Sequence, residues 1–467
     1  MTEIRAQLQK IQNLIDQNRQ DEALEHLQPL LITPPEQAND LYWCGQLAFI
    51  LNLNRPAANL LSKAVELEPE APHYCSMYGL LLSELDQFTA ALDWLRKGVR
   101  LNPESPICHH YLGRHYYNTG QFNLAIACFR KTLSLKKDFL DAYLYLVYTL
   151  IQQTAWEAAD RWVDALLQLA PEHLMGNVLK SRIEFRLHKA GSAKERLQNL
   201  LERYPDYDSG WFEYGTLLQK CKQYQEALTA FVKANDLARH DAIQADFHLE
   251  KQAKVQDATL DGLTVPPPAP LKTAPETQDT PILIIGFPRS GTTLLSAMLD
   301  QHPELHSAGE LTTLPDLRTF AEQQLKAPFD LTAVNLALWS EAHLDLAELL
   351  AQSYVALQAQ LRENQSISRE ARILDKSTAN VQNLPLVARI APKTPIINII
   401  RDGREASWSC FTQDFTNYIW YAHHYLDAIR AWQQEIDMAR RYAQAFNLNY
   451  YELHYEDLVQ NPEDELR

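Results

Sequence analysis

The stretch that decides the fold of the second half of this chain is PILIIGFPRSGTTLLSAML, residues 281–299. It begins with a run of aliphatic residues, passes through a Gly-x-x-x-x-Gly segment from Gly286 to Gly291, and continues with apolar residues at helical spacing. This order predicts a strand, a tight loop and a helix. Backbone N–H groups of such a loop, together with the positive end of the helix, bind a phosphate or a group of similar shape. The sequence therefore predicts an anion-binding loop.

The cations of this loop differ from those of nucleotide triphosphatases. There a Lys reaches the outer phosphates and the next Ser or Thr holds magnesium. Here Thr292 occupies the Lys position, Thr293 follows it, and the loop's cation is Arg289. The missing Lys argues against a P-loop kinase or ATPase, which stays open as an alternative with Asp375 as its acidic magnesium ligand.

The charge balance limits the partners of the chain. The 467 residues include 43 Lys and Arg against 59 Asp and Glu, a net charge of -16. Nucleic acids and anionic membranes attract basic surfaces. We therefore expect no nucleic-acid partner, and any anionic ligand must be held by a few local cations.

Cysteine usage and hydropathy indicate a cytoplasmic protein. The six cysteines contain no C-x-x-C pair, and five lie in helical patterns beside apolar neighbours, which is typical of reduced, buried thiols. The charged N-terminus lacks the apolar core of a signal peptide, and the chain has no apolar run of 18 residues or more. We expect neither a signal peptide nor a membrane span.

The first half of the chain is a repeat array. Alanines recur every 34 residues, at Ala23, Ala57, Ala91, Ala125, Ala159, Ala193 and Ala227. Prolines keep the same step, at Pro35, Pro69, Pro103, Pro171 and Pro205. A small residue precedes most of these alanines, as Gly113 and Gly215 do, and a bulky one follows four residues later, as Phe129 and Phe231 do.

This pattern resembles the tetratricopeptide repeat over residues 4–241, with two antiparallel helices per unit. The small residues let paired helices approach closely, the bulky ones fill the gap, and Pro ends the second helix. We predict about seven repeats and a capping helix over residues 1–256, stacked into an all-α superhelix. The concave face of such a superhelix commonly binds peptides.

A proline-rich segment, residues 257–279, predicts an extended, semi-rigid linker. After it, over residues 280–467, short apolar runs alternate with helical patterns, which predicts a parallel α/β domain with a P-loop-like start. Further strands are expected at 372–375, 394–400 and 450–454, and helices at 314–324, 344–361, 381–390, 405–411 and 421–445. Functional groups should lie where strands end and loops begin.

Polar segments follow several of these elements. They are SAGELT at 307–312 after the first helix, DKST at 375–378, RDGREASWS at 401–409, and YEDLV at 455–459. Together with the Pro-Arg-Ser-Gly-Thr-Thr loop, their order and spacing resemble the sulfotransferase superfamily, most closely its tyrosylprotein-sulfotransferase-like branch. The resemblance covers residues 280–467.

The resemblance implies transfer of a sulfuryl group from the co-substrate 3′-phosphoadenosine 5′-phosphosulfate to an acceptor hydroxyl, of a protein tyrosine or another molecule. It implies Glu310 as the general base, with Arg289 and Lys376 assisting catalysis. The donor would be held by Arg289, Ser290, Gly291, Thr292, Thr293, Arg401, Ser409 and Tyr455. The residue types suit this chemistry, because transfer needs a base for the acceptor proton and fixed positive charge beside the leaving oxygens. No metal is expected to take part.

Each assignment has a structural alternative. Glu310 could only cap the next helix, Lys376 could be a surface lysine, and Arg401 could only stabilise a turn. Relatives usually have another Arg where this chain has Gln413. The family also continues past position 467, so we expect a C-terminally truncated domain that binds the donor weakly.

Two further questions stay open from the sequence. The chain could be a repeat scaffold with an inert α/β domain. The array could recruit a protein substrate, recruit a scaffold, or mediate self-association.

Overall fold

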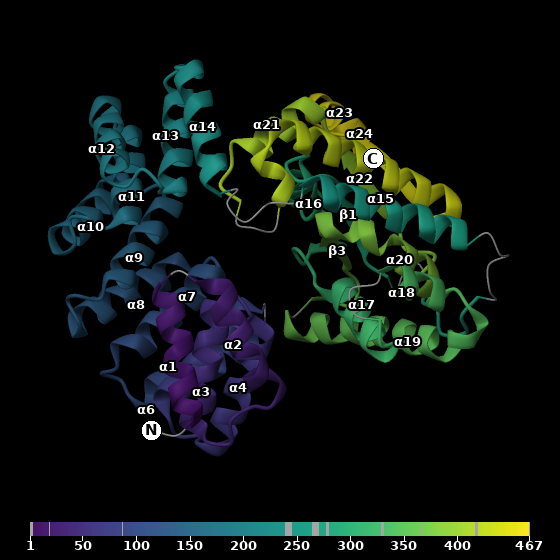
Figure 1. The fold of residues 1–467 in the computed structure, drawn as a ribbon, viewed down its shortest axis with the longest axis horizontal. Coiled ribbons are helices and arrows are strands. Elements are labelled where there is room, and N and C mark those ends of the chain that lie inside the picture. The colour runs from purple at the N-terminus through teal and green to yellow at the C-terminus, as the bar shows by residue number, and fades with distance from the viewer. Residues whose placement is uncertain are drawn as a thin grey trace. The chain divides into compact units, whose positions relative to one another are not determined.

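The computed structural model describes residues 3–17, 19–85, 87–238, 245–263, 270–276, 280–327, 331–365, 367–415 and 419–466 (Figure 1). These residues form two compact units, Met1–Arg203 and Tyr204–Arg467. The predicted fold class, a helical repeat array followed by a parallel α/β domain, is confirmed.

The described part of the first unit contains six antiparallel helix pairs. The recurring alanines are fully buried where paired helices meet, and a Cβ on Gly113 would lie only 2.6 Å from the Cε1 atom of Phe129. The small-then-bulky pattern therefore sets how closely the helices approach. The helices are α1 Glu3–Asp16, α2 Gln20–Ile32, α3 Ala38–Ile50, α4 Asn54–Leu67, α5 Pro72–Glu84, α6 Phe88–Leu101, α7 Pro106–Asn118, α8 Phe122–Leu135, α9 Leu140–Gln152, α10 Trp156–Leu169, α11 Leu174–Arg186 and α12 Ala190–Arg203.

The second unit begins with a seventh helix pair, α13 Asp208–Lys220 and α14 Tyr224–Ala238. Our sequence-based boundaries, 1–256, 257–279 and 280–467, stay a prediction. By its contacts, this last repeat belongs to the same compact unit as the α/β domain.

The α/β domain contains a five-stranded parallel sheet in the order β2-β3-β1-β4-β5. In the register of the sheet, Leu283 lies opposite Asp375 on one side and Ile396 on the other. The strands are β1 Ile282–Ile285, β2 Leu305–Ser307, β3 Arg372–Lys376, β4 Ile396–Ile400 and β5 Tyr450–His454.

Helices cover both faces of this sheet. Leu283 and Ile285 of β1 pack in one apolar cluster with residues of α17, α19, α20 and α22. Ile284 of β1 points to the opposite face and packs with residues of α16 and α23. This alternation explains why β1 is apolar without interruption, as expected of a strand buried on both faces. The helices are α16 Thr292–Leu299, α17 Thr313–Gln324, α18 Leu331–Leu338, α19 Leu344–Asn364, α20 Leu384–Ile390, α21 Gly403–Phe411, α22 Tyr425–Phe446, α23 Tyr455–Gln460 and α24 Pro462–Glu465, with 3₁₀ helices at Glu341–His343, Thr378–Asn383 and Trp420–His423.

The segment between the repeats and the sheet differs from our expectation. Helix α15, Ala245–Gly262, packs against α18 and α22 of the α/β domain, whereas the sequence suggested a cap on the last repeat. The prediction of an extended linker is wrong for residues 257–262, which belong to α15, and residues 264–269 and 277–279 lie outside the described residues. Residues 270–276 run beside α19, where the N–H groups of Lys272 and Thr273 donate to the Glu348 carboxylate at 2.7 and 3.0 Å.

Candidate active site

The sheet order places the predicted site residues in a line. Because all five strands are parallel, their carboxyl ends share one edge of the sheet. The anion-binding loop follows the central strand β1. On one side, Lys376 ends β3 and Glu310 follows β2; on the other, Arg401 follows β4 and Tyr455 follows β5.

The loop after β1 has an unusual backbone. Gly286, Arg289 and Gly291 have φ angles of 150°, 69° and 105°, in the region that favours glycine. A Cβ on Gly286 would lie 2.5 Å from the carbonyl oxygen of Ile399, so the loop passes very close to β4. Arg289 adopts this strained conformation although it is not glycine, which is typical of functional sites.

Ser290 marks the interior of this loop. Its side chain is fully buried, and its Oγ has no hydrogen-bond partner among the described residues. A buried hydroxyl without a partner costs free energy that a bound anion can recover. Thr292 and Thr293 begin α16 directly after Gly291, so the positive end of this helix also faces the loop.

Lys376 connects the loop to Glu310. Its Nζ lies 2.5 Å from the Glu310 Oε1 atom and donates to the Thr293 Oγ1 atom at 3.5 Å. The Lys376 side chain is only 14% exposed, whereas that of Glu310 is 62% exposed. Glu310 is therefore oriented by a fixed cation and remains open to an incoming molecule. The structure does not support a loosely placed surface lysine at position 376.

A buried carboxyl group, Asp375, holds the segment that carries Glu310. Asp375 accepts from the Leu311 N–H at 3.3 Å and from the Asn380 side-chain amide at 3.1 Å. The Lys376 N–H donates to the Gly309 carbonyl at 2.9 Å, which fixes the other side of Glu310. Burial of Asp375, which is 1% exposed, raises its pKa to about 7.

On the other side of the loop, Arg401 makes three kinds of contact. Its Nη1 donates to the Arg289 carbonyl at 3.2 Å, and its guanidinium lies 4.7 Å from the centre of the Tyr455 ring. Its Nη2 and Nε also contact the Glu405 carboxylate, at 2.9 and 3.2 Å. The Arg289 Nε donates to the Ser409 Oγ at 3.0 Å. Contacts thus connect Arg289 of the loop with both Arg401 and Ser409.

Tyr455 closes the loop from the side of β5. A Cβ on Gly291 would lie 2.5 Å from the Cδ2 atom of the Tyr455 ring. Only glycine allows this contact, because Gly291 also has a positive φ.

Helix α21 is fixed at its N-terminus by Asp402. The Asp402 carboxylate accepts from the backbone N–H groups of Arg404 and Glu405, and Arg404 also binds it through its side chain. These bonds, the Arg404 side chain foremost, lower the pKa of Asp402 to about 2. Glu456 accepts from the Asp402 N–H at 3.1 Å, and the Trp432 indole N–H donates to the Arg401 carbonyl at 3.2 Å.

The structure brings all the sequence-predicted site residues to the same edge of the sheet. Their catalytic and binding roles stay predictions. From the sequence, no supporting role was assigned to Asp375, Glu405, Glu456 or Trp432.

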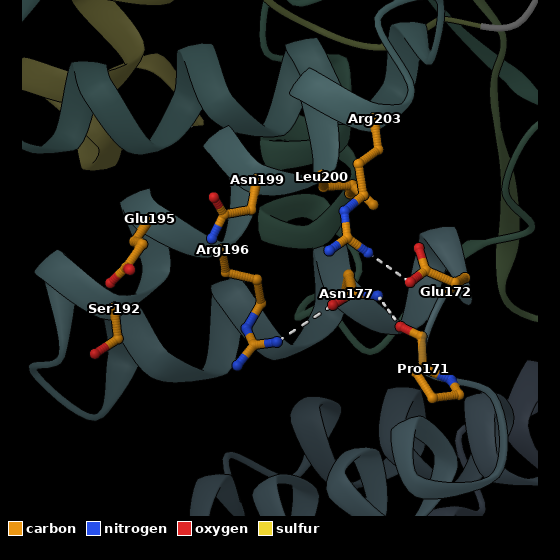
Figure 2. Close-up of a pocket in the computed structure, with 9 residues that line it drawn as sticks. All are labelled: Pro171, Glu172, Asn177, Ser192, Glu195, Arg196, Asn199, Leu200 and Arg203. Carbon is orange, nitrogen blue, oxygen red and sulfur yellow. Dashed lines mark hydrogen bonds and ion pairs between the residues drawn. The ribbon is translucent and has the colours of Figure 1, made fainter.

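A separate pocket of about 270 Å³ lies in the repeat array, lined by α11, α12 and the turn before α11 (Figure 2). Asn177 links its walls, donating to the Pro171 carbonyl at 2.9 Å and accepting from Arg196 at 3.2 Å. Arg203 and Glu172 form an ion pair at 2.6 Å. The lining therefore presents amide groups and both signs of charge.

Within the described ranges, no group of three or more His, Cys, Asp and Glu side chains is arranged to hold a metal ion. None of the described helices combines the length and the apolar character that a bilayer crossing requires.

Known protein families match two parts of this chain. Residues 281–467 match the model described as "Sulfotransferase family", and residues 72–105 and 109–139 match the tetratricopeptide repeat model. An uncharacterised protein of Aquifex aeolicus is 28% identical over 277 residues, which cover 56% of this chain and 33% of that protein. Protein-tyrosine sulfotransferase 1 of Danio rerio is 26% identical over 193 residues, which cover 41% of this chain and 52% of that protein.

These matches span between a third and about half of the length of the two relatives. Among solved structures, a tetratricopeptide repeat protein from Parabacteroides merdae aligns with a TM-score of 0.40 and 15% identity, covering 51% of this chain and 94% of that protein. The family models thus match tetratricopeptide repeats within residues 72–139 of this chain and a sulfotransferase-family domain over residues 281–467.

Proposed function

We propose that the α/β domain transfers a sulfuryl group from 3′-phosphoadenosine 5′-phosphosulfate to an acceptor hydroxyl. The observation that carries this proposal is the Lys376 ammonium, which contacts both Glu310 and the Thr293 hydroxyl at the start of α16. One cation thus connects a candidate base with a candidate anion site.

The loop fits the phosphosulfate end of such a donor. The buried Ser290 hydroxyl has no hydrogen-bond partner in the part of the chain that the structure describes, the loop approaches β4 closely, and α16 begins at the loop. Arg289, Ser290, Gly291, Thr292 and Thr293 would hold this end.

The residues on the other side fit the remaining groups of the donor. Arg401 and Ser409 would hold its 3′-phosphate, and Tyr455 would lie beside its nucleoside. Arg401 already pairs with the carboxylate of Glu405, so a bound phosphate must displace or share this partner.

In the proposed reaction, Glu310 accepts the proton of the acceptor hydroxyl. The acceptor oxygen forms a bond to sulfur while the bond from sulfur to the 5′-phosphate oxygen breaks. The donor supplies the activated sulfuryl group, and the products are the sulfate ester and adenosine 3′,5′-bisphosphate. Lys376 and Arg289 stabilise the negative charge that grows on the leaving oxygens.

The kinase or ATPase alternative is weaker for a structural reason. It would use Asp375 as a magnesium ligand at the end of β3. Asp375 is buried, and its two oxygens accept hydrogen bonds from Leu311 and Asn380. A bound ion would therefore have to share these oxygens with two hydrogen bonds in a buried position.

We propose a protein hydroxyl, first of all a tyrosine, as the acceptor, because several curated relatives are protein-tyrosine sulfotransferases. The repeat array would recruit the protein and raise its effective concentration at the α/β domain. The pocket of Figure 2, which presents amide groups and both signs of charge, is a candidate anchor for a polar peptide segment. All six cysteines are free, which fits a reducing, cytoplasmic compartment.

The test replaces Glu310 by Gln, which keeps the size of the side chain and removes the base. We expect sulfate transfer to tyrosine peptides to fall at least a hundredfold, while calorimetry shows adenosine 3′,5′-bisphosphate binding changed by less than about threefold, roughly 0.6 kcal/mol. Glu363→Gln, an exposed carboxylate late in α19, is the control.

Three outcomes would contradict the proposal. Full activity of Glu310→Gln would remove the base assignment. A wild-type chain that binds the bisphosphate but transfers nothing to peptides, phenols or sugars would support a scaffold with an inert domain. Magnesium-stimulated ATP binding without bisphosphate binding would support the kinase alternative.

A further inference from the structure

The last repeat differs from the others at one register position. Eight residues after the recurring alanine, the first six repeats have an aliphatic residue: Leu31, Val65, Val99, Leu133, Leu167 and Leu201. The seventh has Asn235. Asn235 is only 2% exposed, so a polar side chain has replaced an apolar one in a buried position.

Asn235 contacts the α/β domain with both ends of its amide. Its Nδ2 donates to the Phe411 carbonyl at 2.9 Å and to the carbonyl of Phe231 in its own helix at 2.8 Å. Its Oδ1 lies 3.2 Å from the Nδ1 atom of His423 in the 3₁₀ helix Trp420–His423. The amide therefore joins α14 to two elements that follow the sheet strand β4.

The Phe411 carbonyl is at the C-terminal end of α21, where helix carbonyls lack partners within the helix. Asn235 supplies one partner from another part of the chain. Apolar contacts beside this amide also join α14 to α21, because Phe231 and Phe411 belong to one buried cluster and Trp408 packs against it. The Phe231 and Trp408 rings meet edge-on at 6.2 Å.

The other side of α21 faces the anion-binding loop. Ser409 accepts from Arg289 of that loop at 3.0 Å, and the Cys410 thiol contacts the Pro288 carbonyl at 3.5 Å. Helix α21 thus lies between the loop and the last repeat (Figure 1). In earlier repeats the second helix, such as α4 or α8, packs against the first helix of the next repeat. At α14 the α/β domain provides the neighbour instead.

We propose that the seventh repeat is part of the donor site, and that Asn235 is a positioning residue which sets the place of Ser409 and the loop through α21. This inference rests on the proposed function only for the identity of the ligand. The position of α21 itself requires no ligand.

The experiment compares Asn235→Leu, which restores the residue of other repeats, with the wild-type full chain. We expect the Kd for adenosine 3′,5′-bisphosphate to rise about tenfold, because a buried carbonyl loses its partner. Hydrogen exchange without ligand should become faster in the backbone amides of α21.

A matched pair of variants separates positioning from general stability. Phe231 and Phe129 each cover the glycine of their own repeat, Gly215 and Gly113, at nearly the same distance. Only Phe231 also contacts Trp408. Phe231→Leu should therefore weaken bisphosphate binding and loosen α21, whereas Phe129→Leu should do neither. This pair also decides the question if Asn235→Leu fails to fold.

The outcomes are distinguishable. Unchanged exchange of α21 in Asn235→Leu, or equal effects of Phe231→Leu and Phe129→Leu, would overturn the inference. If the wild-type chain does not bind the bisphosphate while α21 still responds to the variants, the proposed function fails and the positioning of α21 by the last repeat stands.

Discussion

Replacing Asp375 by Asn should remove part of the pH dependence of the stability of the α/β domain. Burial raises the pKa of this carboxyl from its ordinary value of 3.8 to about 7. The folded protein therefore holds the Asp375 proton more tightly than the unfolded chain does. The stability that this proton contributes is fully present below pH 3.8, and it is lost as the pH rises through about 7.

The size of this loss of stability follows from the shift in the pKa of Asp375. About three pKa units correspond to about 4 kcal/mol between the two ends of this range. Between pH 5 and 8.5 the wild-type domain should lose about 3 kcal/mol through Asp375 alone. Asn cannot ionise, so the variant lacks this loss. It also lacks one acceptor for the Leu311 and Asn380 hydrogen bonds, which costs about 1 kcal/mol at every pH.

We therefore expect Asp375→Asn to be less stable than the wild type at pH 5 and more stable at pH 8.5. The chain has two compact units that need not unfold together, so the readout must be local. Pulsed hydrogen exchange against urea, followed in the peptide that covers β3, supplies it.

A comparison of variants is needed because burial also raises the pKa of Glu435, to about 8. The change of wild-type stability with pH includes contributions from both carboxyl groups. The difference between the wild type and Asp375→Asn isolates the contribution of Asp375. Asp345→Asn, at an exposed position early in α19, is the control and should keep the wild-type pH dependence. If Asp375→Asn shows the same pH dependence as the wild type, the buried carboxyl is not protonated as we argue.

Two predictions concern the donor site. Gly291→Val should abolish bisphosphate binding, because its Cβ would lie 2.5 Å from the Tyr455 ring at a φ of 105°; calorimetry checks this, and retained binding would contradict the loop geometry. Arg401→Ala should weaken adenosine 3′,5′-bisphosphate binding at least tenfold, about 1.4 kcal/mol, and leave adenosine 5′-monophosphate binding nearly unchanged. Equal losses for both nucleotides would remove the 3′-phosphate assignment.

Most of the strand and helix order could be predicted from the sequence, because long apolar runs and helical spacing are local signals. The strand Leu305–Ser307 was missed, since three residues are too few to show an alternating pattern. The helix Leu331–Leu338 was also missed, as a short apolar run does not separate helix from strand.

The site residues could be predicted because each follows a strand or a turn, and the sheet order then brings them together. Their supports could not be found in this way. Asp375 was placed at a strand end, but only the register with β1 and the contact with Leu311 show that it points inward. The exceptional residue Asn235 could have been found from the sequence by aligning the repeats at their 34-residue period.

The two supports explain how an exposed site can keep a fixed geometry. Glu310 is 62% exposed, which suits the role of base proposed for it. Asp375, which holds the segment that carries Glu310, is 1% exposed, and Asn235 of α14, which contacts the C-terminal end of α21, is 2% exposed. The accessible groups depend on buried polar groups that a substrate never touches. Substitutions at these supports should therefore alter binding and transfer at the proposed site through geometry, and the last repeat can affect this site through α21.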